Sequence, residues 1–369
     1  LHQSAVALLG HPLPSGDKLQ LGIGTLAQLA RQIGYRLTAA GRQPPSSEQQ
    51  RQAVAECLLL HQDVIEAYGW LGQLVEAVYC TLDALNLSEY LQDRNHQATW
   101  SSIFAYLLGL IPLPQLSQYY LRKAQDLARD IDSERAQADI LRISGLFQMH
   151  VAEWEAATET LKKGAALAHK IGDEPLYLFL MWQVVSVKLH TYEWDQALAV
   201  IAQLAEMCKK NHHHRYVAWF QATEGHILIR RGRWAEGEVK LLVASGLMSQ
   251  SNDILLESFV GGVLAASALH RGDQKQARKW ADETLNRFRG KGIPGHGGLE
   301  GFPSLVEVYL ALWQKSHDPA ERVELLAQLS RARRLMKQYG KVFKLGTARY
   351  HILEGQYHFH TGSLTKAVQ

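Results

Sequence analysis

Small residues recur along this chain at a fixed spacing of forty residues. Six positions, called landmarks below, mark the recurrence: Leu74, Pro114, Trp154, Trp194, Trp234 and Gln274. Three residues after each landmark stands a small residue: Ala77, Ser117, Ala157, Ala197, Gly237 and Ala277. Ten residues after each landmark the row is again mostly small: Ala84, Ala124, Gly164, Leu204, Ala244 and Thr284. The chain is therefore predicted to be an array of similar units.

The row between the two small rows is mostly apolar. Seven residues after each landmark stand Thr81, Leu121, Leu161, Ile201, Leu241 and Ala281. Offsets of three, seven and ten fall on one face of an α-helix. Small residues at this spacing let two helix backbones approach closely, and the apolar row fills the contact. Each landmark therefore predicts a helix that packs on its neighbours along most of its length.

A second helical stretch precedes the landmark in the well-marked units. These stretches are Ala138–Met149, Tyr177–Leu189, Tyr216–Arg230 and Leu255–His270. Glycines at Gly172, Gly232 and Gly272 stand where a helix is expected to end. Alternating runs rich in valine and isoleucine are missing, so strands are not expected. The prediction is an all-α chain of antiparallel helix hairpins with a period of about 40 residues.

The order Trp154-x2-Ala157-x3-Leu161-x2-Gly164 resembles the latter half of a tetratricopeptide repeat. The standard tetratricopeptide unit has about 34 residues, whereas HEAT and armadillo units have about 40 to 47. The tetratricopeptide-like alternative is favoured, because extra residues can lengthen helices and loops and because HEAT units do not require this order. The resemblance implies a right-handed superhelical solenoid.

A wider resemblance covers almost the whole chain. The segments that carry the resemblance are Ala7–Pro14, Ala77–Leu87, Leu299–Pro303 with the following helix Val306–Trp313, and the basic helix Arg331–Tyr339. The chain resembles the carboxy-terminal helical-repeat region of large bacterial signalling ATPases of the AAA or STAND type. Many of these carry a class III adenylate or guanylate cyclase domain. The resemblance implies a sensing role in such a parent protein. ATP would bind elsewhere in that parent, and no cofactor is expected in this fragment.

Composition and length bound the class of protein. The 369 residues are 47% hydrophobic and 20% charged, with a formal net charge of +3. No run of about 18 uncharged apolar residues and no signal segment is present, so a cytoplasmic protein without a membrane span is expected. Three widely spaced cysteines, Cys57, Cys80 and Cys208, are expected to be buried free thiols.

Three segments are expected along the chain. Residues 1–47 would be the end of a preceding helical unit and a linker with an irregular stretch at Gly41–Ser47, residues 48–289 the repeat array, and residues 290–369 a loop followed by enlarged, truncated helical units. Because the chain begins without methionine and restarts the landmark pattern at Leu364, a fragment of a longer polypeptide is expected.

Candidate chemistry is sparse. Gly290–Gly295 fits the letters of a dinucleotide fingerprint but lacks the preceding strand, so a flexible connecting loop is favoured. Asn211–His214 is expected to be a solvated loop, because adjacent side chains diverge and no ligand motif accompanies them. His351 and Glu354, one helical turn apart, favour a surface contact. No catalytic and no metal-binding residue is nominated, and whether the chain is an enzyme is left open.

The densest basic stretch offers an alternative function. It contains Arg331, Arg333, Arg334, Lys337, Lys341, Lys344 and Arg349. A nucleic-acid-binding helical-repeat regulator of transcription is the alternative, although a solvated helix face is favoured because no base-stacking aromatic motif accompanies the stretch.

The favoured function is a non-catalytic scaffold for protein–protein interaction and regulation. The first helices of successive units should line the inner surface of the array and bind a peptide, a protein or another domain of the same polypeptide. Six residues are expected on this concave side: Asp139, Arg142, Phe179, Trp182, Trp219 and His226. The aromatic members are equally consistent with core positions.

Overall fold

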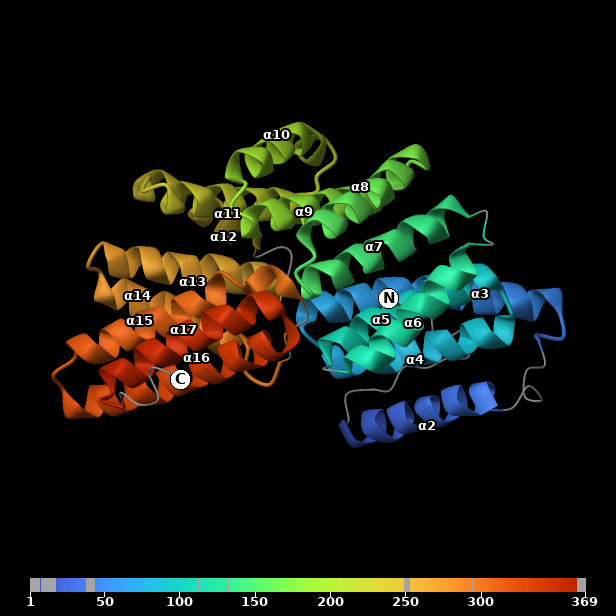
Figure 1. Cartoon of the computed structure of the whole chain (residues 1–369), viewed down its shortest axis with the longest axis horizontal. Coiled ribbons are helices and arrows are strands. Elements are labelled where there is room, and N and C mark those ends of the chain that lie inside the picture. Colours follow the sequence, from blue (N-terminus) through green and yellow to red (C-terminus); the bar gives the residue numbers. More distant parts are fainter. Residues whose placement is uncertain are drawn as a thin grey trace. The chain divides into compact units, whose positions relative to one another are not determined.

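A computed structural model describes residues 7, 18–37, 44–111, 113–129, 131, 133–248, 253–291, 293 and 295–363. Every regular element among these residues is a helix (Figure 1). The helices are α2 (Lys18–Leu37), α3 (Glu48–Leu71), α4 (Leu74–Leu91), α5 (Arg94–Leu110), α6 (Pro114–Ala128), α7 (Glu134–His150), α8 (Trp154–Lys170), α9 (Glu174–His190), α10 (Trp194–Lys210), α11 (His214–Arg230), α12 (Trp234–Met248), α13 (Ile254–His270), α14 (Gln274–Arg287), the 3-10 helix η2 (His296–Gly298), α15 (Gly301–Lys315), α16 (Pro319–Val342) and α17 (Lys344–His360). The all-α prediction is confirmed.

The forty-residue register coincides with the helix boundaries. Each of the six landmarks is the first residue of a helix: α4, α6, α8, α10, α12 and α14. The first helices of the hairpins, α5, α7, α9, α11 and α13, also begin forty residues apart. The four first helices expected from the sequence are present and begin one to four residues earlier than predicted. The chain is thus a series of helix hairpins, as expected.

Every residue of the three predicted packing rows is buried. A close approach lies between α11 and α12, where two glycines face each other. A Cβ atom at Gly225 would lie 2.7 Å from the carbonyl oxygen of Gly237, and one at Gly237 would lie 2.5 Å from that of Gly225. Real Cβ atoms do not come this close, so only glycine permits this crossing.

The landmark tryptophans pack against the end of the next first helix. Trp234 stacks on His270, with ring centroids 3.8 Å apart, and Trp154 lies 6.2 Å from His190. Both histidines end their helices thirty-six residues after the landmark. The recurrence of tryptophan therefore serves contacts between successive hairpins.

The turns between helices repeat every twenty residues. Backbone with positive φ occurs at Gly72, Gly172, Gly232 and Gly272, and also at the non-glycine residues Gln92, Ala152, Tyr192 and His212. The residue after the left-handed position donates its N–H back to the helix, as from Asp173 to the Ala168 carbonyl oxygen at 2.9 Å and from Arg233 to that of Leu228 at 2.9 Å. This is the Schellman arrangement that satisfies the last carbonyls of a helix.

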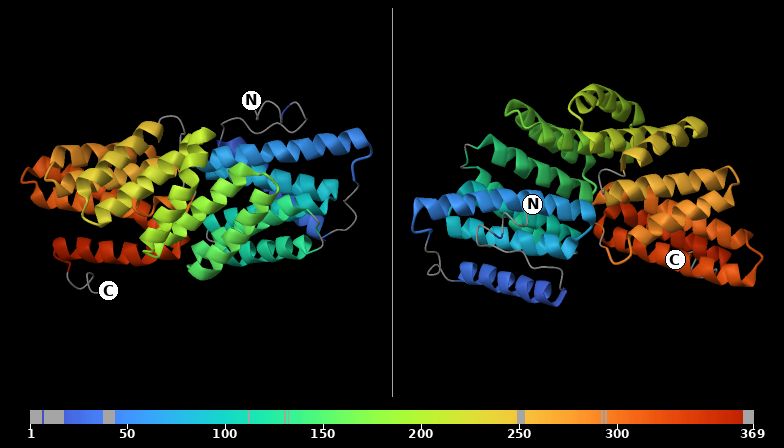
Figure 2. Two further views of the ribbon diagram at one scale, coloured as in Figure 1. Left: turned by 90° about the horizontal axis from the view of Figure 1, so that it is seen from above. Right: turned by 180° about the vertical axis from the view of Figure 1, so that it is seen from behind.

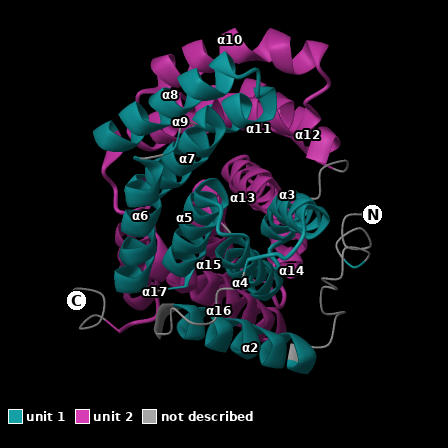
Figure 3. Cartoon of the chain, turned by 90° about the vertical axis from the view of Figure 1, so that its right-hand side faces the viewer, with its two compact units in different colours: residues 1–148, 155–180 teal, residues 149–154, 181–369 magenta. Residues whose placement is uncertain are grey.

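The chain divides into two compact units (Figure 3). Unit 1 comprises residues 1–148 and 155–180, and unit 2 comprises residues 149–154 and 181–369. The expected segments 1–47, 48–289 and 290–369 were defined by the sequence repeat, whereas the two units are defined by compact packing. The segments therefore stay a prediction. Residues 41–43 of the expected connection, most of Ala7–Pro14 and the landmark Leu364 lie outside the described residues.

Each unit has one set of helices beyond the regular array. In unit 1, α2 packs against α4, and in unit 2 the helices α15, α16 and α17 pack on one another (Figure 2). Part of the stretch expected as a flexible connecting loop, Gly290–Gly295, is packed into unit 2, since Ile293 is buried, and the residues His296 and Leu299 that follow it are buried as well. The three cysteines are buried, as predicted. None of the described helices has the length and apolarity needed to cross a membrane.

Candidate functional site

The six residues expected to bind a partner occupy three equivalent positions of the first helices. Asp139, Phe179 and Trp219 are spaced by forty residues, as are Arg142 and Trp182. His226 stands seven residues after Trp219, which is about two helical turns further along α11. We call the two longer rows the first-helix face: Thr99, Asp139, Phe179, Trp219 and Phe259, with Ser102, Arg142, Trp182, Ala222 and Gly262. In unit 1 this face is polar and charged except at Phe179, and in unit 2 it is apolar.

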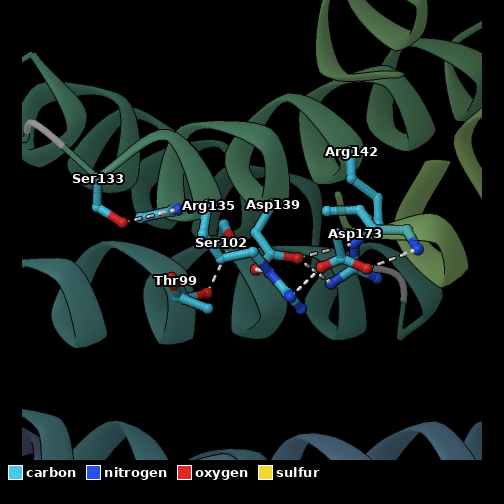
Figure 4. A network of polar contacts seen from close by, with 9 residues as sticks. Thr99, Ser102, Ser133, Arg135, Asp139, Arg142 and Asp173 are labelled. Atoms are coloured by element: carbon cyan, nitrogen blue, oxygen red, sulfur yellow. Dashed lines mark hydrogen bonds and ion pairs between the residues drawn. The ribbon is translucent and has the colours of Figure 1, made fainter. Parts of the chain in front are cut away.

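Two arginines share one carboxylate on the unit 1 part of this face (Figure 4). On α7, Arg135 Nε donates to Asp139 Oδ2 at 3.1 Å and Arg142 Nε donates to Asp139 Oδ1 at 3.3 Å. Arg135 also donates to Asp173, which caps α9 by accepting the Leu176 N–H at 3.1 Å. Burial lowers the pKa of Arg135, but the carboxylates of Asp139 and Asp173 outweigh it and raise the pKa overall. The network fixes α7 against the start of α9.

Arg142 is a partly exposed member of this network, and Arg135 is more exposed, at 52%. Its guanidinium carbon lies 5.6 Å from the centroid of the Phe179 ring, a cation–π arrangement. The Arg142 side chain is 23% exposed, whereas that of Asp139 is only 5% exposed. An arginine oriented by a buried carboxylate and backed by an aromatic ring is prepared to bind a carboxylate, because little side-chain entropy remains to be lost.

The tryptophans on the unit 2 part of the face are buried. Trp182 and Trp219 lie with ring centroids 4.6 Å apart, and each is 3% exposed. Trp219 Nε1 donates to Asp253 Oδ2 at 2.8 Å, which satisfies the indole N–H. Neither ring is open to a partner in this conformation. Their role in partner binding stays a prediction.

Asp253 anchors this arrangement at the start of α13. Its Oδ1 accepts the backbone N–H groups of Leu255 and Leu256, both at 3.1 Å. Burial raises the pKa of Asp253 to about 6, although these hydrogen bonds oppose the rise. The carboxylate is thereby committed to capping α13 and to holding Trp219.

His226 is buried next to a charged pair. Its Nε2 lies 3.6 Å from Glu300 Oε2, and Arg349 Nη2 lies 3.3 Å from the same oxygen. Burial lowers the pKa of His226. For Glu300, burial acts to raise the pKa, but the charges of His226 and Arg349 lower it overall. The sixth predicted residue is therefore part of an internal polar contact.

Further buried histidines lie near the tryptophans. His296 stacks with Trp182 at 6.3 Å between ring centroids, and it lies 6.2 Å from His190. Burial lowers the pKa of His150 and of His190 to about 4, and it lowers the pKa of His296 well below its usual value. Within the described part of the chain, no group of three or more histidine, cysteine or acidic residues is arranged to hold a metal ion.

Sequence reasoning missed His296, Asp253 and Glu300. They come from segments far from Trp182 in the sequence, and the register of the first helices does not predict which later segment packs on them. A signal near this site is the glycine-rich stretch Gly290–Gly295, which is followed by Gly297 and Gly298. Its composition predicts a connection, whereas the residues directly after it form a contact surface.

Parts of the basic stretch are neutralised within the fold. Arg333 donates from Nε and Nη2 to the two carboxylate oxygens of Glu354 at 2.7 and 2.6 Å, and its guanidinium lies over the Tyr357 ring at 3.4 Å. Arg349 faces Glu300. Glu354 thus serves mainly to bind Arg333, a contact that the proximity of His351 did not predict.

The fold has counterparts among solved structures. NprR in complex with its cognate peptide NprX matches with a TM-score of 0.57 and 12% identity, over 85% of this chain and 87% of that one. A Rap protein complexed with Competence and Sporulation Factor matches with a TM-score of 0.53 and 11% identity, over 95% of each chain. Both are tetratricopeptide-like helical-repeat proteins, and at these identities the likeness establishes this fold for the chain. The sequence matches no protein-family model and no curated protein.

Proposed function

We propose that the chain is a non-catalytic regulatory module that binds a peptide or an extended protein segment on the unit 1 part of the first-helix face. The observation that carries the proposal is Arg142, partly exposed, held by Asp139 and lying over Phe179. A carboxylate of the partner, at its carboxy terminus or on an acidic side chain, would bind the outer edge of this guanidinium. The aliphatic part of the partner would then lie on Phe179.

The solved structures of similar fold support a binding role for this kind of array. NprR was crystallised with a cognate peptide, and the Rap protein with Competence and Sporulation Factor. A stack of helix hairpins offers one continuous surface built from equivalent positions, which suits an extended ligand.

The proposal is tested by selecting ligands and then removing the anchor. A random peptide library is selected on the purified chain, and the affinity of enriched peptides is measured by calorimetry. Arg142→Ala should weaken binding by about tenfold or more, because a charge-assisted contact to a carboxylate contributes about 1.5 to 3 kcal/mol. Lys163→Ala is the matched control, because Lys163 is a solvent-exposed cation paired with Glu159 on α8.

Two outcomes would count against this function. One is that no peptide is enriched. The other is that Arg142→Ala and Lys163→Ala bind the enriched peptides as tightly as the original chain does, which would place the ligand elsewhere.

A parent signalling ATPase or nucleotidyl cyclase is a separate proposal, and it rests on the sequence resemblance alone. In such a cytoplasmic parent, binding of the partner to the array would bias the nucleotide-hydrolysing domain between two states. The full-length polypeptide should then contain a phosphate-binding loop of the form glycine-x4-glycine-lysine-serine or -threonine. ATP turnover by the purified chain on its own would contradict a non-catalytic role.

Nucleic-acid binding is the weaker alternative. Arg333 forms an ion pair with Glu354, and Arg349 forms one with Glu300. Fewer cations are therefore available to bind backbone phosphates than the sequence suggests. Salt-sensitive DNA binding that disappears when Arg331 and Arg334 are neutralised would restore this alternative.

A further inference from the structure

The segment from His296 to Gly301 crosses three first helices of unit 2 in order. His296 stacks on Trp182 of α9, and a Cβ atom at Gly297 would lie 2.9 Å from the Trp219 ring of α11. Gly301 then lies against Gly262 of α13, where the two backbones are in direct contact. The segment, whose first three residues form the 3-10 helix η2, therefore contacts successive first helices of unit 2.

The contacted residues belong to the first-helix face. Trp182 occupies the position of Arg142, and Trp219 occupies the position of Phe179. In unit 1, Arg142 and Phe179 are partly exposed, whereas in unit 2 every residue of the face is buried. The segment thus contacts Trp182 and Trp219, whose counterparts Arg142 and Phe179 in unit 1 are partly exposed.

Glycine is required where the segment meets the array. The Cβ atom that any other residue would bring at Gly297 is too close to the Trp219 indole, and one at Gly298 would lie 2.5 Å from the Phe302 ring. The turn therefore brings bare backbone close to the Trp219 ring, while the His296 side chain stacks on Trp182.

Polar attachment is slight at His296 and Gly297, whereas Glu300 further along the segment pairs with His226 and Arg349. The Tyr339 hydroxyl donates to the His296 carbonyl oxygen at 2.7 Å. The imidazole of His296 is 7% exposed, and neither ring nitrogen has a hydrogen-bond partner among the residues that the structure describes. A buried polar group without a partner costs about 1 to 3 kcal/mol, which favours release of the segment.

We propose that His296 and Gly297 are an intramolecular ligand, which occupies an aromatic peptide-binding site formed by Trp182 and Trp219. A partner peptide that displaces the segment would carry an aromatic or imidazole side chain followed by glycine. This rests on the proposed function only in using the first-helix face as a binding surface. The two sites lie in different units and are tested separately.

Displacement requires that the segment open while unit 2 stays folded. Leu299→Cys places a thiol in the segment, and Leu305→Cys places a matched thiol in α15, since both leucines are buried. The rate of reaction with a thiol reagent is measured in native buffer for each variant, with the unsubstituted chain correcting for the three buried native cysteines. The thiol at position 299 should react at least about tenfold faster, because it needs only local opening. Equal rates would show that the segment opens only when α15 unfolds, and they would overturn the proposal.

Binding in trans is tested with a synthetic peptide of residues 290–301. The variant His296→Ala/Gly297→Val removes the imidazole and forces the segment off Trp219. Fluorescence anisotropy of the labelled peptide should show binding to this variant at least about tenfold tighter than to the original chain, in which the tethered segment competes at an effective millimolar concentration. The same peptide with alanine in place of histidine should not bind.

The outcomes separate this proposal from the previous one. Failure of the peptide to bind a folded variant would overturn the intramolecular ligand, and Arg142→Ala would be without effect on this binding if the proposal holds. If the double variant does not fold, the thiol-reaction rates alone decide. If Arg142→Ala loses binding of the library-selected peptides, that result concerns the site in unit 1 and says nothing about the Trp182 site.

Discussion

At the scale of residues, the ends of the helices depend on a single backbone conformation. Among the described residues, six glycines have φ in the left-handed region, and four other residues have it as well, among them Ala152 with a φ of 63°. An L-residue with a Cβ atom pays about 1 to 2 kcal/mol in this region, and glycine does not. The repeat therefore contains positions where its own sequence is not the most stable choice.

Ala152→Gly is predicted to stabilise the chain. The gain in unfolding free energy should be about 1 kcal/mol or less, because relief of backbone strain exceeds the extra entropy of glycine in the unfolded chain. Urea unfolding followed by circular dichroism measures the change. The matched control is Gly232→Ala at the equivalent turn, with a φ of 80°, which should destabilise by about 1 kcal/mol. A loss of stability in Ala152→Gly would contradict the assigned conformation of this turn.

Also at the scale of residues, the packing rows contain small residues because the facing helices lie too close together for larger ones. The facing carbonyl oxygens leave no room for a Cβ atom at Gly225 or Gly237, and Leu161 leaves none at Gly145, where a Cβ atom would lie 2.6 Å away. The sequence rows therefore identify real contacts between helices. The row residue Leu204 is large, and it is buried like the small members of its row.

At the scale of elements, α16 and α17 are joined by a charged contact within the basic stretch. Arg333 is 18% exposed and binds Glu354 through two parallel hydrogen bonds, while Arg334 beside it is exposed. Burial lowers the pKa of Arg333, but the bond to Glu354 outweighs it and raises the pKa overall. The two neighbouring arginines therefore have different roles.

Arg333→Ala is predicted to destabilise unit 2 by about 1 to 3 kcal/mol, because Glu354 is left without its partner and the contact with Tyr357 is lost. Arg334→Ala should change the unfolding free energy by no more than about 0.5 kcal/mol. Thermal and urea unfolding of both variants check the difference. If the two variants are equally stable, the bidentate contact does not hold α17 in place.

At the scale of the whole molecule, buried histidines have lowered pKa values in unit 2, whereas His61 in unit 1 has a raised pKa. In unit 2 burial lowers the pKa of His150, His190, His226 and His296, so these imidazoles bind a proton less readily in the folded chain than in the unfolded one. In unit 1 burial acts to lower the pKa of His61, but its contact with Asp83, 3.1 Å away, raises the pKa to about 10. Protons therefore affect the two units in opposite directions.

Acidification is predicted to destabilise unit 2. Below pH 6.5, the pKa of an unperturbed histidine, the unfolded chain binds protons at these histidines and the folded chain does not. For His150 and His190 this difference continues down to about pH 4. Each such histidine removes up to about 1.4 kcal/mol per pH unit in this range. Asp253 opposes the loss, because its raised pKa of about 6 lets the folded state take up a proton first. His61 is protonated in folded unit 1 throughout this range, and its contribution is lost only as the pH rises toward 10.

Urea unfolding at pH 7.5, 6.0 and 5.0 tests this prediction. The unfolding free energy of unit 2 should fall by a few kcal/mol between pH 7.5 and 5.0. His190→Phe removes one of the imidazoles and should make the dependence shallower. A stability that is constant or that rises on acidification would show that the histidines are not buried in the neutral form.

The sequence by itself determined the repeat, the helices and the rows by which they pack. These features depend on contacts between neighbouring hairpins, which a fixed spacing of small and apolar residues records directly. It also indicated Arg142 and Phe179, because equivalent positions of the first helices share one face. The sequence could not decide that Trp182 and Trp219 would be covered, or that Asp253, His296 and Glu300 would meet there. Only the tertiary structure decided these contacts, because they join segments of different register, and no periodic pattern specifies which irregular segment packs on a regular array.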